Sequence, residues 1–167
     1  PGRAAGPGCR PALVGAVPHR YGHPGGPLPL ETYFAMARGR QDVDVDVTAM
    51  EMTKWFDINY HYIVTEFDAD TQFRVASPHL FREVAEARAL GISPKAVLIG
   101  PLTYLYLGKE STPGFSRLDL LPRLLPVYRE ILGQLASLGV EWVQIDEPLL
   151  ALDLEDEWLR GLDQAYA

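Results

Sequence analysis

The densest group of side chains that could bind a ligand or transfer protons lies in residues 50–67, which read M-E-M-T-K-W-F-D-I-N-Y-H-Y-I-V-T-E-F. A single lysine, Lys54, stands there among aromatic and acidic residues, and His61 lies between two tyrosines. A lysine ammonium attracts carboxylates as a point charge, and a histidine can act as a general base near neutral pH. The pattern predicts a strand that runs out into a functional loop, as at the carboxyl end of a strand in a parallel sheet.

Both residues also have a purely structural interpretation. Lys54 can be a surface lysine, or it can form a salt bridge with Glu51 or Asp57. His61 can be a hydrogen-bonded histidine in the wall of the fold, which is the commoner situation for this residue type. The residues alone leave the ligand-binding and the structural interpretations open.

A second candidate is the acidic pair Asp146 and Glu147, which precedes Pro148 at the end of a predicted strand. Two carboxylates about 5 to 9 Å apart can hydrolyse glycosides, so either residue together with Glu66 could form a hydrolase site. Adjacent residues on a strand point to opposite faces, however, and the pair can face one substrate only if the chain turns there, as Pro148 allows. The residues alone leave a hydrolase site and a structural corner open.

An alternation of Asp and Val at residues 42–47 gives the opening spacing of a calcium-binding loop. Such a loop requires Gly at its sixth position and Glu at its twelfth, where this chain has Val47 and Thr53. We therefore reject calcium binding and predict an exposed edge strand or loop with one solvated face.

Composition limits the classes of function. The chain has 167 residues, 47% of them hydrophobic, which is enough for one core. A net charge of -7 argues against binding to nucleic acid or to an anionic membrane surface. Cys9 is the only cysteine, so the chain encodes no disulfide framework and no cysteine-rich zinc site. No apolar run is long enough to span a bilayer and no signal-peptide pattern is present, which predicts a cytoplasmic protein.

The chain divides by composition at residue 29. Residues 1–29 are rich in Gly and Pro and predict an irregular segment, and the start on Pro1 instead of Met indicates a fragment or a processed product. Residues 30–167 alternate predicted helices and strands. We expect helices at residues 30–39, 77–91, 126–138 and 154–166, and buried strands at residues 96–100 and 140–146.

This alternation is typical of a parallel sheet with right-handed crossover helices. A complete eight-fold barrel needs roughly 250 residues, so residues 30–167 can supply only part of one. The predicted fold class is α/β: a partial TIM-type (βα) barrel of about three βα units with parallel strands.

Four motifs carry a resemblance to a known family. They are G-A-V-P-H-R-Y-G-H-P-G-G with T-Y-F-A-M-A-R-G, then E-M-T-K-W-F-D-I-N-Y-H-Y, V-L-I-G-P-L-T-Y-L-Y-L-G-K and G-V-E-W-V-Q-I-D-E-P. In this order they resemble the amino-terminal half of cobalamin-independent methionine synthase, the 5-methyltetrahydropteroyltriglutamate-homocysteine methyltransferase family. The resemblance covers nearly everything after Leu13. Thr65 and Ile58 depart from the residues that are common in the family, which affects the expected shape of the loop.

The resemblance implies a two-barrel enzyme that moves a methyl group from a polyglutamylated folate to the sulfur of homocysteine without cobalamin. It implies a zinc ion in the carboxy-terminal barrel, which binds the thiol and lowers its pKa. The zinc ligands would lie beyond residue 167, so this chain alone would be inactive. Within the chain, the resemblance assigns Lys54 as a contact to the folate substrate. It favours a structural corner for Asp146 and Glu147, because the same D-E-P pattern recurs in the catalytic half of the family.

Three interpretations therefore remain. The first is part of a folate-dependent methyltransferase that supplies scaffold and contacts to the polyglutamate tail through Lys54. The second is a structural half-barrel that contacts no ligand. The third is a carboxylate-based barrel hydrolase that uses Asp146 or Glu147.

Overall fold

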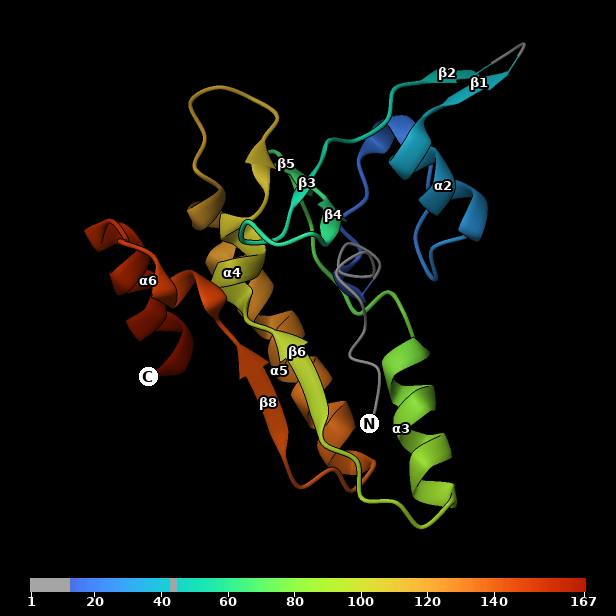
Figure 1. Ribbon diagram of the computed structural model, residues 1–167, viewed down its shortest axis with the longest axis vertical. Helices are drawn as coiled ribbons and strands as arrows, with labels where there is room; N and C mark the ends of the chain where they lie inside the picture. The colour runs from blue at the N-terminus through green and yellow to red at the C-terminus, as the bar shows by residue number, and fades with distance from the viewer. Residues whose placement is uncertain (1–12, 43–44) are drawn as a thin grey trace.

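The computed structural model describes residues 13–42 and 45–167 and shows a mixed α/β fold (Figure 1). The α-helices are α2 (Leu30–Arg38), α3 (His79–Ala89), α4 (Pro101–Tyr106), α5 (Leu121–Ser137) and α6 (Asp156–Tyr166). The 3-10 helices are η2 (His19–Tyr21), η3 (Arg117–Leu120) and η4 (Pro148–Ala151). The strands are β1 (Arg40–Asp42), β2 (Val45–Val47), β3 (Met52–Lys54), β4 (His61–Ile63), β5 (Glu66–Phe67), β6 (Ala96–Ile99), β7 (Lys109–Glu110) and β8 (Val143–Asp146).

The described strands form four pairs. β5 pairs with β7 and β6 pairs with β8, both in parallel, whereas β1–β2 and β3–β4 are antiparallel hairpins. Helices α4 and α5 lie between β6 and β8 in the chain, as a parallel connection requires. The predicted α/β class and the parallel β6–β8 pair are therefore confirmed, and the pairing as a whole is mixed rather than all parallel. The four pairs do not join into one closed sheet within the described residues.

The main core lies where α4 and α5 pack together beside the β6–β8 pair (Figure 1). One face of α5 is apolar, because its buried side chains recur three and four residues apart. The core members with almost no exposed surface include Phe67, Leu102, Leu105, Leu124, Ile131, Leu135 and Leu149. A second, smaller cluster packs α2 against the β3–β4 hairpin through Met36, Met50 and Ile63.

Helix α5 starts earlier than the sequence predicts. We expected Pro126 to confine the regular helix to the residues after it, but α5 begins at Leu121 and runs through Pro126. Pro122 lies in the first turn, where a missing N–H costs nothing, and Pro126 removes one further N–H donor. The buried Leu124, Val127 and Tyr128 surround Pro126 and hold this turn against the core.

Two apolar residues expected in the core are instead exposed. Leu90, predicted to lie on the buried face of α3, is the residue that ends the helix, and it is 78% exposed. Trp142 was placed in the last strand, but β8 begins one residue later and Trp142 is 74% exposed. Both residues lie just outside the element that would bury them. The predicted helix and strand, which were based on hydrophobic periodicity, are therefore each too long.

The amino-terminal part agrees with the expectations where the structure describes it. α2 ends at Gly39, whose φ of 75° favours glycine. The predicted edge strand at residues 42–47 is the β1–β2 hairpin, although Asp44 lies outside the described residues, as does Cys9. Val14 and Ala16 belong to the main core, and the division of the chain at residue 29 stays a prediction. In the described ranges, no helix has both the length and the apolar character needed to cross a bilayer.

Candidate functional site

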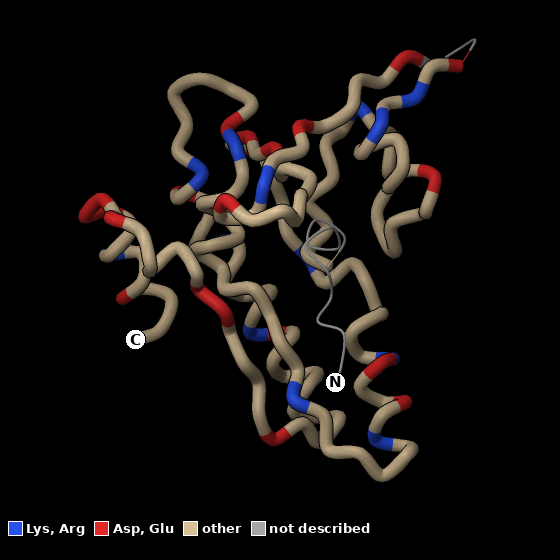
Figure 2. The backbone as a smooth tube through the Cα atoms, in the orientation of Figure 1, with Lys and Arg blue, Asp and Glu red and all other residues tan. Residues whose placement is uncertain are grey.

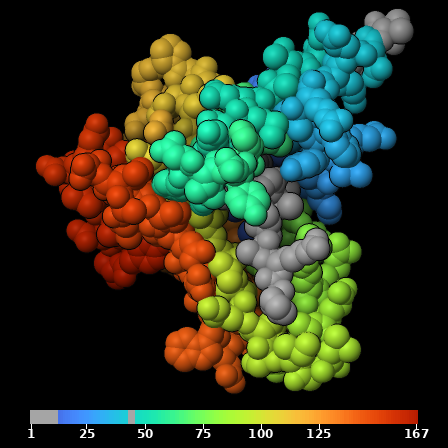
Figure 3. Space-filling view, viewed as in Figure 1, coloured from blue at the N-terminus to red at the C-terminus, as the bar shows by residue number. Residues whose placement is uncertain are grey.

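The β3–β4 hairpin, residues 52–63, lies on the molecular surface (Figures 1 and 3). It carries Lys54 on β3 and His61 on β4. Its register pairs Met52 with Ile63, Thr53 with Tyr62, and Lys54 with His61. Lys54 is thus the last residue of its strand, as the sequence predicts, but the partner strand is antiparallel and not a neighbour in a parallel sheet. The side chains of Lys54 and His61 are both exposed to solvent.

The hairpin closes through a tight turn at Phe56 and Asp57. Their φ angles are 42° and 61°, and the amide N of Ile58 donates to the carbonyl O of Trp55 at 3.0 Å. Positive φ at both central residues is the geometry of a type I′ turn, which matches the twist of a two-stranded hairpin. Such turns prefer Asn and Gly, so the sequence Phe56-Asp57 does not predict a hairpin.

The base of the hairpin is fixed to the rest of the molecule. The Tyr62 side chain is 7% exposed, and its hydroxyl donates to the carbonyl O of Leu107 at 3.0 Å. The Trp55 ring stands edge-on to Tyr62, with ring centroids 5.8 Å apart. Ile63 is buried against Met50 and α2. The backbone that carries Lys54 is therefore held in place.

The Lys54 side chain is exposed to solvent. Over the ranges that the structure describes, Lys54 forms no ion pair with Glu51 or Asp57, the two acids that the sequence offered as partners. The Glu51 carboxylate instead lies 3.2 Å from the Nζ of Lys109. The salt-bridged interpretation of Lys54 is thus not seen in the structure.

A chain of alternating charges extends from the hairpin across β5 and β7. Lys109 lies 3.2 Å from Glu51 and 3.8 Å from Glu66, and Glu66 in turn accepts two hydrogen bonds from Arg20, one of them at 2.9 Å. Basic and acidic residues are accordingly interleaved around β3 and β7 (Figure 2). The hydrogen bonds to Glu66 raise the pKa of Arg20, because they favour the charged guanidinium. The sequence analysis missed Arg20 and Lys109, which are separated from their partners by 46 and 58 residues.

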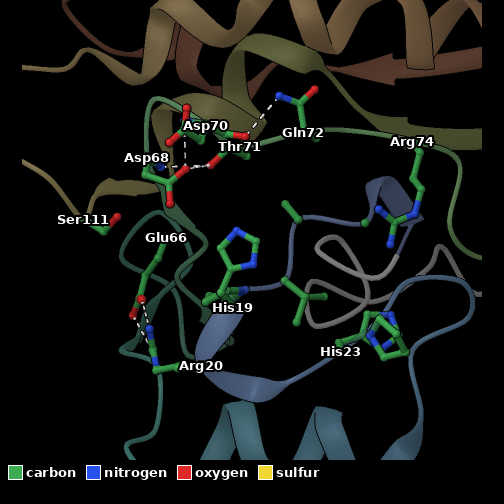
Figure 4. Close-up of a pocket in the computed structure, with 15 residues that line it drawn as sticks. His19, Arg20, His23, Glu66, Asp68, Asp70, Thr71, Gln72, Arg74 and Ser111 are labelled. Carbon is green, nitrogen blue, oxygen red and sulfur yellow. Dashed lines mark hydrogen bonds and ion pairs between the residues drawn. The ribbon is translucent and has the colours of Figure 1, made fainter.

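A polar cavity of about 430 Å³ lies where β5 ends, between the turn that follows β5 and residues 15–24. Its walls carry both acids and bases, and Figure 4 shows the His19 ring between the turn that contains Asp68 and Asp70 and the side chain of Arg74. One carboxylate oxygen of Asp68 is already hydrogen-bonded, because Oδ1 accepts from the Thr71 hydroxyl at 2.9 Å. Three carboxylates and two arginines line this cavity, so charges of both signs face it.

The acidic pair is part of the framework. Both Glu147 carboxylate oxygens cap the first turn of α4, accepting from the amide N of Leu102 at 3.1 Å and of Thr103 at 2.7 Å. The Tyr166 hydroxyl donates to Glu147 at 2.8 Å, and burial together with this bond raises the pKa of Tyr166. Asp146 accepts from the Gln144 side chain at 2.7 Å. This is the structural corner that the sequence analysis favoured.

The contacts of these carboxylates also argue against the hydrolase interpretation. Glu66 is 11% exposed and is held by Arg20 and Lys109, while Glu147 is held by two amides and a phenol. Among the described residues, the hydrogen bonds of the three candidate carboxylates go to different partners. Among residues 13–42 and 45–167, no group of three or more His, Cys, Asp or Glu side chains could hold a metal ion.

Fold and site together define an α/β domain with a surface hairpin that is fixed at its base and carries an exposed lysine. The chain belongs to the family described as "Cobalamin-independent synthase, N-terminal domain", whose family model matches residues 10–167. The resemblance stated from the four motifs is therefore confirmed.

Curated relatives agree with the family. The chain is 68% identical over 154 residues to a 5-methyltetrahydropteroyltriglutamate-homocysteine methyltransferase of Nitrosomonas europaea, covering 92% of this chain and 20% of that protein. It is 58% identical over 154 residues to the protein of the same name from Aeromonas salmonicida, and 49% identical over 180 residues to that from Acidithiobacillus ferrooxidans. These matches cover 92% of this chain and 20% and 22% of the two proteins, so the chain spans about a fifth of the length of its relatives.

Proposed function

We propose that this chain is part of a methyltransferase that transfers the methyl group of 5-methyltetrahydropteroyltriglutamate to homocysteine and so forms methionine. The relatives that support this reaction bear it in their names, and one of them is 68% identical to this chain. The methyl donor and homocysteine are accordingly the proposed ligands of the whole enzyme.

The part played by this chain in the proposal is to supply scaffold and to bind the polyglutamate tail of the methyl donor. A triglutamate tail is a row of carboxylates, and a lysine ammonium attracts each of them as a point charge. Lys54 is exposed and forms no ion pair among the described residues, and its hairpin is fixed at its base by Tyr62; this observation carries the role. In a chain with a net charge of -7, a placed cation also offsets repulsion of an anionic ligand.

The proposal also concerns the two barrels of the whole enzyme. Residues 30–167 form part of an amino-terminal (βα) barrel, supported by the parallel pairs β5–β7 and β6–β8. The carboxy-terminal catalytic barrel holds the zinc ion that would deprotonate the homocysteine thiol. The ligands of that ion lie outside this chain, and the enzyme works in the cytoplasm.

A structural half-barrel without ligand contacts is the alternative that this proposal must exclude. The two proposals differ in what they predict for the charge at residue 54. If Lys54 has only a structural role on an exposed strand, a neutral polar residue can replace it with almost no loss of stability.

The test uses a chimera in which this chain replaces the matching segment of the Nitrosomonas europaea methyltransferase, its 68% identical relative. We expect the chimera to form methionine from the triglutamate donor. Lys54→Gln should raise KM for that donor about three- to tenfold with kcat little changed, since one exposed charge contact is lost. Lys95→Gln, at the start of β6, is the matched control and should leave KM unchanged. An inactive chimera, or equal KM values for both variants, would refute the proposal.

A further inference from the structure

We propose that His61 is a second contact for the anionic tail, so that Lys54 and His61 together bind neighbouring carboxylates and give the site its preference for a polyglutamylated donor. This inference rests on the proposed function, and it adds the residue that lets the hairpin discriminate a tail of several glutamates from a single glutamate.

The strand register brings the two side chains together. The amide N of Trp55 donates to the carbonyl O of Tyr60 at 2.7 Å, and the amide N of Val64 donates to that of Glu51 at 2.8 Å. Hydrogen-bonded and non-hydrogen-bonded pairs alternate along an antiparallel ladder, so Lys54 and His61 form a non-hydrogen-bonded pair. In such pairs the Cα atoms approach to about 4.5 Å and the side chains lie close on one face.

One ring nitrogen of His61 is committed to the backbone and the other is not. Nδ1 lies 3.2 Å from the carbonyl O of Asn59, and since a carbonyl only accepts, Nδ1 is the donor in this bond. The structure shows no hydrogen bond from Nε2 over the residues it describes. A carboxylate bound here would take one hydrogen bond from Nε2 and another from the Lys54 ammonium.

The local charge balance favours an anion between the two residues. A cation and an imidazole placed opposite each other do not attract, and two positive charges in this position destabilise the pair. Two acids lie nearby in the chain: Glu51 is paired with Lys109 at 3.2 Å, and Asp57, in the turn, forms no ion pair with Lys54 among the described residues. A bound carboxylate would offset the repulsion between the two positive charges, and a tail with several carboxylates can contact both side chains at once.

Binding measurements on the chimera test the inference. Dissociation constants are measured for the triglutamate and monoglutamate forms of the methyl donor, with His61→Gln, His61→Arg and the control His79→Gln. His79 is an exposed histidine on α3, 3.6 Å from Glu83. We expect His61→Gln to weaken triglutamate binding about three- to tenfold and monoglutamate binding less than twofold. His61→Arg should retain the affinity for the triglutamate form, and His79→Gln should change neither constant.

Two results would overturn the inference: His61→Gln weakens both donors equally, or His61→Arg is no better than His61→Gln. Lys54→Gln, measured in parallel, separates this inference from the proposed function. If Lys54→Gln weakens triglutamate binding and His61→Gln does not, only the role of His61 is refuted. If neither variant weakens it, the tail does not bind at the hairpin and both are refuted.

Discussion

Lys54 and His61 face each other across the last strand pair of the β3–β4 hairpin, one residue before the chain turns back at Phe56 and Asp57. The adjacent pair, Thr53 and Tyr62, fixes the hairpin to the body of the molecule through the Tyr62 hydroxyl. A short antiparallel ribbon thus holds two exposed, basic side chains on a rigid support. The predictions below concern this support, the framework behind it and the charge at its end.

Loss of the Tyr62 hydroxyl should loosen the hairpin. In Tyr62→Phe the partly buried carbonyl O of Leu107 loses its donor, which should cost about 1 kcal/mol of local stability. We expect faster amide hydrogen exchange across β3 and β4 of the chimera and a modest rise in KM for the triglutamate donor. Tyr60→Phe is the control, because Tyr60 is exposed in the loop and should change neither quantity. Identical exchange in the two variants would show that Tyr62 does not anchor the hairpin.

The turn at Asp57 should respond to substitution in two directions. Its φ of 61° suits glycine, so Asp57→Gly should stabilise the hairpin by about 0.5–1 kcal/mol. A β-branched residue is strained in this conformation, and Asp57→Val should destabilise the hairpin by about 1–2 kcal/mol. Hydrogen exchange of the hairpin amides measures both effects. Equal exchange rates in the glycine and valine variants would rule out the left-handed turn.

Substitution of glycine by alanine should have opposite effects on stability at Gly100, beside Glu147, and at Gly133, inside α5. A Cβ at Gly100 would lie 2.0 Å from the Glu147 Cδ, so Gly100→Ala should displace the carboxylate that caps α4 and lower the thermal midpoint of the chimera. A Cβ at Gly133, inside α5, meets nothing within 4 Å, so Gly133→Ala should stabilise the helix by about 0.5–1 kcal/mol.

Glu147→Gln is the companion variant at this corner. It should speed exchange at the amides of Leu102 and Thr103, which lose their charged acceptor. If the two alanine variants shifted the thermal midpoint in the same direction, Glu147 would not be packed against Gly100.

The Glu110–Arg117 pair predicts a dependence of stability on pH. Burial raises the pKa of Glu110, but hydrogen bonds and the charge of Arg117 outweigh it and lower the pKa below its ordinary 4.5. A carboxyl with a lowered folded pKa stabilises the protein above its unfolded pKa and loses this effect as the pH falls through the folded pKa. The thermal midpoint of Glu110→Gln should therefore lie below that of the parent chimera at pH 6, and the gap should close below pH 4.5.

The exposed Glu130→Gln on α5 is the control for this titration. A gap between Glu110→Gln and the parent that stayed constant from pH 6 to the acid limit would contradict a titrating pair, since only an ionised Glu110 can attract Arg117.

Much of the framework was predictable from local patterns in the sequence. The glycines after α2 and α3 and the apolar run of β6 carry their signals within a few residues, whereas α3 begins at His79, two residues later than the predicted start at residue 77. The starts of α5 and β8 were misplaced because packing against the core, and not local propensity, decides where those elements begin.

The site was only partly predictable for a related reason. Residues 50–67 stood out by composition, but the type I′ turn at Phe56 and Asp57 contains no glycine that would announce it. The charge chain through Arg20, Glu66 and Lys109 joins segments far apart in the sequence, and no spacing rule connects them. Family resemblance singled out Lys54, and the register then brought His61 to its side.

The most direct test of the central claim is a thermodynamic cycle between the charge at residue 54 and the tail of the methyl donor. Dissociation constants of the chimera and of Lys54→Gln are measured for the triglutamate and the monoglutamate donor. We predict that Lys54→Gln weakens triglutamate binding about three- to tenfold more than monoglutamate binding, because only the longer tail reaches the ammonium. Equal factors for the two donors, or no change in either, would contradict the claim that Lys54 binds the polyglutamate tail.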